Sequence, residues 1–72
     1  MIDTQVAELT IKALLAGLHA KLTDAALIAK AARACADAGS ISECIRVSMD
    51  LDQLVYDASR LHDAITAIES LM

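Results

Sequence analysis

Two cysteines, Cys35 and Cys44, are the residues of this 72-residue chain whose type and spacing most directly suggest chemistry. They lie on either side of Gly39 and Ser40, so a helical turn there would bring the two sulfurs close together. As thiolates they could supply half of a soft-metal site, or they could form a disulfide. A complete zinc site needs four ligands, and no histidine lies within a helical turn of either cysteine. We interpret both as packed thiols and expect no metal and no cofactor.

Two histidines and a short acidic run are the other candidates for chemistry. His19 and His62 could act as bases or titrate near neutral pH, but no nucleophile is placed to converge on them. Asp50, Asp52 and Asp57 lack the central glycine and terminal glutamate of an EF-hand loop. The sequence also lacks glycine-rich phosphate loops, paired CxxC motifs and a helical HExxH motif. We therefore expect no catalytic residues, and the sequence leaves open a site assembled between subunits from cysteines and histidines.

The composition predicts the scaffold that must position these residues. Hydrophobic residues make up 57% of the chain, proline is absent, and there are two glycines. This surplus of apolar residues excludes disorder, and the abundant alanine favours helix over strand. A chain of this length has no room for a second core. We expect one all-α domain over residues 1–72.

Charge and hydropathy exclude several classes of partner. The net charge is −4, and the six cations are scattered singly, so a nucleic-acid backbone is a poor partner. The longest apolar stretch, residues 13–20, contains His19 and is flanked by Lys12 and Lys21. This stretch is too short to span a membrane. The N-terminus has no basic region ahead of an apolar run. These features predict a cytoplasmic protein that binds neither nucleic acid nor membrane.

The clearest break in the sequence is a turn at residues 39–40. Gly39 can adopt the left-handed conformation that ends a helix, and Ser40 with Glu43 matches a capping box. A long helix is expected from about 41 to 70, because the three-and-four spacing of apolar residues continues past Met49. This length exceeds the diameter of a compact globule of the same mass.

The first arm is predicted to be helical from about 4 to 38, with Asp3 or Thr4 as its N-cap. Thr23 could cap a further helix, which would split this arm near residues 21–23. The sequence leaves both forms open, so the expected fold is either an antiparallel helical hairpin or a three-helix arrangement with a long C-terminal helix.

Both arms carry an apolar stripe at alternating spacings of three and four residues, which we call the seam. On the first arm the seam comprises Ala7, Ile11, Leu14, Leu18, Lys21, Ala25, Ile28, Ala32 and Cys35. On the second arm it comprises Cys44, Val47, Leu51, Leu54, Ala58, Leu61, Ile65, Ile68 and Met72. Leu15, Leu22, Ala29 and Ala36 flank the seam of the first arm. Antiparallel pairing about the turn places residue i opposite roughly residue 79 − i.

A lone hairpin covers each helix on one side only, and apolar residues also lie outside the seam. The predicted interface residues are Leu9, Leu27, Ile45, Met49 and Tyr56. We therefore expect a non-enzymatic interaction module that self-associates, completing a four-helix-type bundle, or that binds a helical protein partner. One alternative is a small metal-binding or redox protein, or an enzyme, with an inter-subunit Cys/His site. Another is an assembly accessory whose exposed seam is filled by a different chain.

Overall fold

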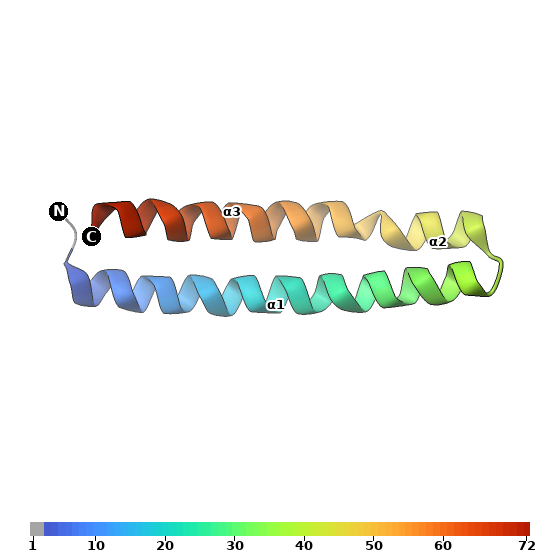
Figure 1. Ribbon diagram of the computed structural model, residues 1–72, viewed down its shortest axis with the longest axis horizontal. Coiled ribbons are helices and arrows are strands. Elements are labelled where there is room, and N and C mark those ends of the chain that lie inside the picture. Colours follow the sequence, from blue (N-terminus) through green and yellow to red (C-terminus); the bar gives the residue numbers. More distant parts are fainter. Residues whose placement is uncertain (1–2) are drawn as a thin grey trace.

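The computed structural model describes residues 3–72, and the regular structure of this range is entirely helical. Helix α1 spans Thr4–Asp37, α2 spans Ile41–Ser48 and α3 spans Asp50–Leu71. Helix α1 runs antiparallel to α2 and α3, which follow one another along the opposite side (Figure 1). The prediction of an all-α fold in which two long arms pack together is confirmed.

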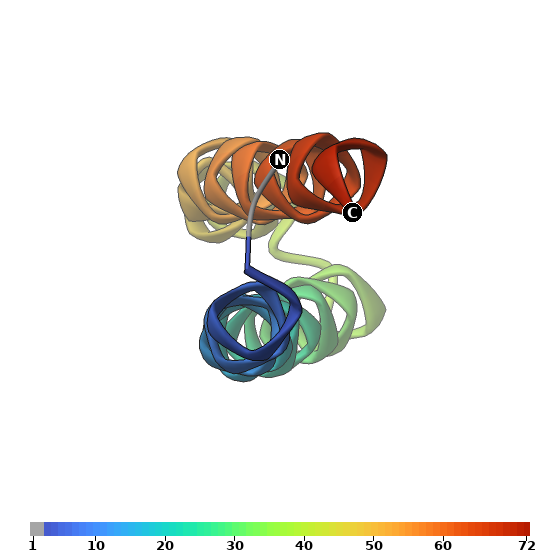
Figure 2. The same cartoon turned by 90° about the vertical axis from the view of Figure 1, so that its left-hand side faces the viewer.

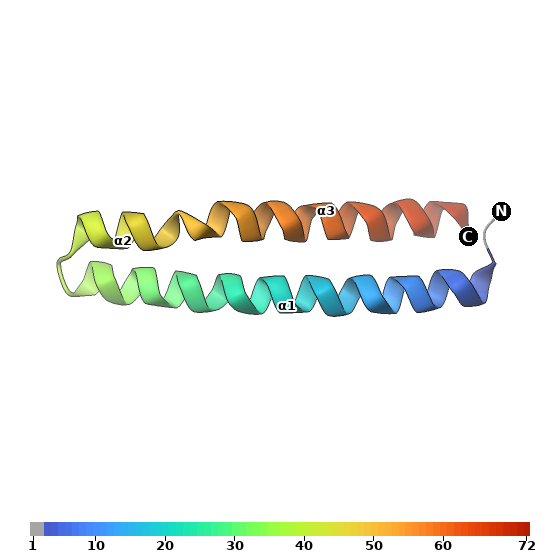
Figure 3. The ribbon, with the colours of Figure 1, turned by 180° about the vertical axis from the view of Figure 1, so that it is seen from behind.

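The hairpin is long and two layers thick. Its Cα atoms extend over 54 × 14 × 11 Å, with a radius of gyration of 16.5 Å. A compact chain of this length would have a radius of gyration of about 11 Å. Seen along its length, the molecule has α1 in one layer and α2 and α3 in the other (Figure 2). The view from behind shows the same pairing along the whole length (Figure 3).

Helix α1 begins at a side-chain cap. The Asp3 carboxylate accepts hydrogen bonds from the backbone N–H groups of Gln5 at 2.8 Å and Val6 at 3.2 Å. These two groups have no partner inside the helix, so the carboxylate satisfies donors that would otherwise bind water. Of the two residues expected as the cap, Asp3 fills the role.

Helix α1 continues without a break through Thr23, so the split that the sequence left open does not occur. The Thr23 hydroxyl donates to the backbone carbonyl of His19 at 2.8 Å. This bond runs back along the same helix, and the hydroxyl is therefore not used to cap a new one. The first arm is a single helix of 34 residues.

The turn after α1 is closed by Gly39. Its φ angle is +85°, and the N–H groups of Gly39 and Ser40 bond to the carbonyls of Ala36 at 3.0 Å and Cys35 at 3.1 Å. This pair of bonds is the Schellman motif, which requires a left-handed residue and so favours glycine. The predicted role of Gly39 is confirmed.

The capping box expected at Ser40 and Glu43 does not form. Ser40 precedes α2, but its side chain makes no capping hydrogen bond. The Glu43 carboxylate instead pairs with Arg46, one helical turn further along the chain. The prediction was wrong because a charged partner at i+3 competes for the carboxylate that would otherwise bond back to the Ser40 N–H.

The second arm is two helices, where the sequence predicted one from 41 to 70. At Met49 the bonding tightens: its N–H reaches the Arg46 carbonyl, and its own carbonyl accepts from Asp52, each at 3.3 Å. These i→i−3 bonds interrupt the α-helical ladder for one residue. Asp50 and Asp52 then lie in the first turn of α3, where negative charge is favourable. Because the φ and ψ angles of Met49 stay near helical values, the seam continues from α2 into α3.

Burial follows the predicted seam. Every seam position on α1 is buried or half-buried, and so is every seam position on α2 and α3. Met72, which lies after the end of α3, is the exposed exception among the predicted seam residues. Hydrophobic spacing in the sequence therefore identified the side of each helix that faces the other arm.

Two contacts between the arms fix their register. Lys21 pairs with Asp57 at 3.1 Å, and Gly17 lies against the Leu61 side chain. The residue numbers in each pair sum to 78, which is within one residue of the predicted register. Lys21, the charged residue within the seam, is thus accommodated by an ion pair at the edge of the helix interface.

Gly17→Ala should stabilise the hairpin. A Cβ atom at this position would meet Leu61 Cδ1 at 3.6 Å, which is ordinary van der Waals contact. Replacing a mid-helix glycine by alanine gains about 1 kcal/mol of helix propensity. The expected result is a rise of up to about 1 kcal/mol in the free energy of unfolding, measured by chemical denaturation at a fixed protein concentration. A loss of stability would show that the arms approach more closely at Gly17.

Gly39→Ala is the matched comparison. The same atoms are added, but at a φ of +85°. An L-residue in this conformation costs about 1–2 kcal/mol, so the free energy of unfolding should fall by that amount. Equal effects of the two substitutions would contradict the turn geometry described here.

Candidate interaction surface

The interior of the hairpin is small. Within residues 3–72 the buried residues are Ala7, Ala25 and Ala58, which are 0%, 8% and 6% exposed. The leucines and isoleucines of the seam remain half-exposed. The described part of the chain also contains no pocket. The features available for function are therefore on the surface.

Large apolar side chains cover much of that surface. Each of the following is about half exposed or more: Val6, Leu9, Leu15, Leu22, Leu27, Ile41, Ile45, Met49, Val55, Tyr56, Leu71 and Met72. Single exposed apolar residues are normal in soluble proteins, but contiguous ones mark interaction sites. Their arrangement around the two arms decides which of them form a continuous surface.

Angular position separates these residues into groups. At 3.6 residues per turn, Leu15 and Leu22 lie about 70° around α1 from the centre of the seam. Leu9 lies about 170° and Leu27 about 130° from that centre, on the side of α1 that faces away from the other arm. The first pair borders the contact between the arms, whereas the second pair lies on the outer face of one helix.

One long edge of the hairpin is apolar. Val55 lies about 70° from the seam of α3, and the register places it level with Leu22 across the contact. We call this edge the apolar flank and define it by Leu15, Leu22, Ala29, Ala36, Ile41 and Val55, with Ser48 between the last two. It runs from the middle of the hairpin to the turn, and Glu8, His62 and Glu69 occupy its other end. The apolar flank is contributed by both arms.

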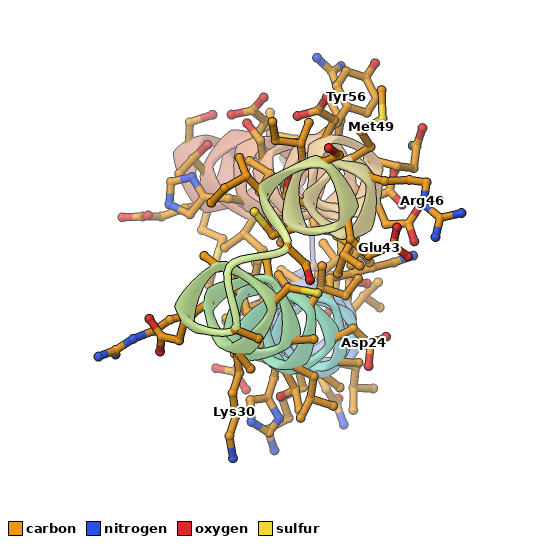
Figure 4. All side chains as sticks on the ribbon, turned by 90° about the vertical axis from the view of Figure 1, so that its right-hand side faces the viewer. Asp24, Lys30, Glu43, Arg46, Met49 and Tyr56 are labelled. Atoms are coloured by element: carbon orange, nitrogen blue, oxygen red, sulfur yellow. The ribbon has the colours of Figure 1, made fainter. Side chains whose placement is uncertain are left out.

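The opposite edge carries carboxylates over the half nearer the turn. We call it the acidic flank and define it by Asp24, Glu43, Asp50 and Asp57. Viewed from the turn, Asp24 of α1 and Glu43 of α2 lie on the same side of the molecule, with Arg46 beside Glu43 (Figure 4). The two long edges of the hairpin therefore differ sharply in polarity.

The Lys21–Asp57 ion pair joins a seam residue of α1 to the acidic flank of α3. Both side chains are partly exposed, at 40% and 29%. The bond from Lys21, supported by a second bond from the Gln53 amide at 2.8 Å, holds the pKa of Asp57 below its ordinary value of 3.8. Asp57 therefore adds stability above that pH, and this contribution is lost as the pH falls through the lowered pKa.

The five residues expected at an interface do not share one surface. Met49 and Tyr56 point away from α1, on the outer face of the second arm (Figure 4). Leu9 and Leu27 lie on the outer face of α1, on the opposite side of the molecule. Ile45 lies between the outer face of α2 and the apolar flank. All five are exposed, and their participation in an interface stays a prediction.

Val55 is the residue that sequence reasoning missed. It stands seven residues after Ser48 and fourteen after Ile41, which repeats the spacing of Leu15, Leu22, Ala29 and Ala36 on the first arm. That repeat was a usable signal. Its meaning depended on knowing that the two rows lie side by side.

The two cysteines are free thiols and are both half-buried. The Cys44 thiol donates to the backbone carbonyl of Ile41 at 3.0 Å, within its own helix. Thiols in such positions act as small packing residues with a weak donor. The interpretation of the pair as packed thiols stays a prediction.

The other candidates for chemistry do not converge. Within residues 3–72, no group of three or more histidine, cysteine, aspartate and glutamate side chains is arranged to hold a metal ion. His19 and His62 are both exposed, on different arms. In the acidic run of the second arm, Asp57 forms an ion pair with Lys21, and Asp52 is exposed in the first turn of α3.

Comparison of the chain with protein-family models, with curated proteins and with solved structures finds no match. In the described range, residues 3–72, none of the helices has an apolar stretch that is long enough to cross a bilayer. The function of the chain is therefore inferred from its own residues and geometry.

Lys21→Met should raise the pKa of Asp57 toward 3.8, because the first of its two stabilising bonds is lost. The rise should be incomplete, since the bond from Gln53 remains. The measurement is an NMR titration of the side-chain carboxyl carbon. Lys12→Met removes an equivalent charge away from Asp57 and should leave this pKa unchanged. An unchanged pKa in the Lys21 variant would contradict the ion pair.

Proposed function

We propose that this chain is a non-enzymatic helical interaction module that self-associates, each copy supplying half of a four-helix-type bundle. One observation carries the proposal: the folded chain exposes 5250 Å². A compact monomer of the same mass exposes about 4,300 Å². A single copy therefore leaves roughly 950 Å² more surface in water than a chain of this size needs to.

The shape of the hairpin explains this excess. Two layers of helix bury one stripe of each arm, and in residues 3–72 the buried residues are three alanines. Chains of this size seldom obtain more than about 3–5 kcal/mol from a single core and commonly add oligomerisation, metals or disulfides. The cysteines are free thiols, which leaves association as the favoured route.

The proposed partner is a second copy of the chain. The net charge of −4 and the acidic flank disfavour phosphate backbones as partners. We place the protein in the cytoplasm as part of the same proposal, where the two thiols would stay reduced. The outer residues Leu9, Leu27, Met49 and Tyr56, with Ile45, remain candidates for contacts beyond a first pair.

Measurement of mass in solution tests this proposal. Sedimentation equilibrium from micromolar to millimolar protein should give a mass of at least twice the 7.6 kDa of one chain, falling on dilution. Circular dichroism of the same samples should show that helix content falls together with the mass, because association supplies burial that the single hairpin lacks.

Three results would contradict the proposal. The first is a stable helical chain at 7.6 kDa throughout the concentration range. The second is a protein that becomes soluble only when co-expressed with another chain, which would indicate a heterologous partner. The third is stoichiometric metal in elemental analysis, or thiols that react only after reduction, which would favour a metal or redox role for Cys35 and Cys44.

A further inference from the structure

We infer that the second copy docks on the apolar flank, so that Leu22 and Val55 of each protomer become core residues of the bundle. This inference rests on the self-association proposed above and names the surface that carries it. In a twofold dimer the same patch is used by both copies, so the flank of one hairpin covers the flank of the other.

The geometry of four-helix bundles favours this edge. A bundle helix buries its seam together with one neighbouring row, which makes an apolar stripe at least 100° wide. On α1 the row about 70° from the seam contains Leu15 and Leu22, and on the second arm the corresponding row contains Ile41 and Val55. A partner on this flank would also cover the half-exposed side of the seam, completing burial of the residues that the hairpin leaves in part to solvent.

The area to be covered matches a second copy. A specific protein–protein interface buries about 800 Å² of each partner. The surface that the hairpin exposes beyond that of a compact chain is of the same size, at roughly 950 Å². One contact with a second hairpin is therefore sufficient to bring the exposed surface down to that of an ordinary globular protein.

The acidic flank is a poor site for a second copy. Docking two such edges with their turns at the same end would bring Asp24, Glu43 and Asp50 of both copies together in a dimer whose protomers each carry a net charge of −4. Like charges brought together at an interface are unfavourable and select against that arrangement. The carboxylates therefore favour the apolar flank as the edge on which a second copy docks.

The outer faces carry fewer large apolar side chains close together. On α1, Leu9 and Leu27 are separated by 18 residues, which is about 27 Å along the helix, and the apolar residues between them on that face are alanines. On the second arm, the region around Tyr56 is interrupted by Asp52, Arg60 and Asp63. Each outer face also belongs to one arm only, so a partner there would leave the seam as exposed as before.

Leu22→Asp and Leu27→Asp form a matched pair that tests the docking surface. Both change a leucine of α1 to the same acid, at sites that are 50% and 61% exposed in one copy. Helix propensity and net charge therefore change equally. Leu22→Asp should raise the dimer dissociation constant at least about a hundredfold, because a carboxylate enters the interface twice without a partner. Leu27→Asp should change it less than about threefold.

Val55→Asp provides an independent check from the other arm, with Tyr56→Asp as its neighbouring control. The first should weaken the dimer as Leu22→Asp does, and the second should not. Sedimentation equilibrium gives the dissociation constants, and circular dichroism at high protein concentration verifies that each variant is helical.

The results separate this inference from the proposed function. A parental dimer that is weakened by Leu27→Asp or Tyr56→Asp, and not by Leu22→Asp or Val55→Asp, would overturn the apolar flank while leaving self-association intact. A parental chain that is monomeric at every concentration would overturn both. Equal weakening by all four substitutions would also contradict the inference, since it would show a general effect of added charge.

Discussion

Two helices packed side by side bury one stripe of each, and the remaining surface of both stays in water. In residues 3–72 this constraint leaves only three alanines buried, while the large seam residues, such as Ile28 and Leu51, are half-exposed. The contact between the arms therefore decides the shape of the molecule without enclosing much of its apolar surface. Both the proposed self-association and the choice of docking surface follow from this shortage of burial.

The turn and one ion pair fix the register of the contact between the two arms. The two bonds that close the Schellman motif at Gly39 set where the second arm starts, and the Lys21–Asp57 pair holds the arms in the same register near mid-length. A slip of one residue would rotate the side chains of a helix by about 100° relative to its neighbour. Fixed register therefore brings Leu22 level with Val55 and makes a single surface from two separate rows.

The two flanks differ in polarity, so the two long edges of the hairpin are not equivalent as docking surfaces. Over the half of the hairpin nearer the turn, carboxylates and an ion pair border the seam on one edge, and mainly aliphatic side chains border it on the other. Such a pattern combines attraction on one side with repulsion on the opposite side, and this combination favours a closed pair over open-ended stacking of hairpins. The exposed outer residues, such as Leu27 and Met49, lie on opposite sides of the molecule, whereas both arms contribute to the apolar flank.

The sequence by itself determined the helical class, the seam, the cap at Asp3 and the turn at Gly39, because each of these depends on residue type and on spacing within one segment. It left the continuity at Thr23 open, and it wrongly predicted an unbroken second arm through Met49 and a capping box at Ser40. In each case alternative hydrogen-bond partners within one turn compete for the same groups. The sequence also could not identify the two flanks, since Val55 gains its significance only from lying beside Leu22. Periodicity gives the angle of a side chain on its own helix, whereas the packing of the two arms decides which edges meet.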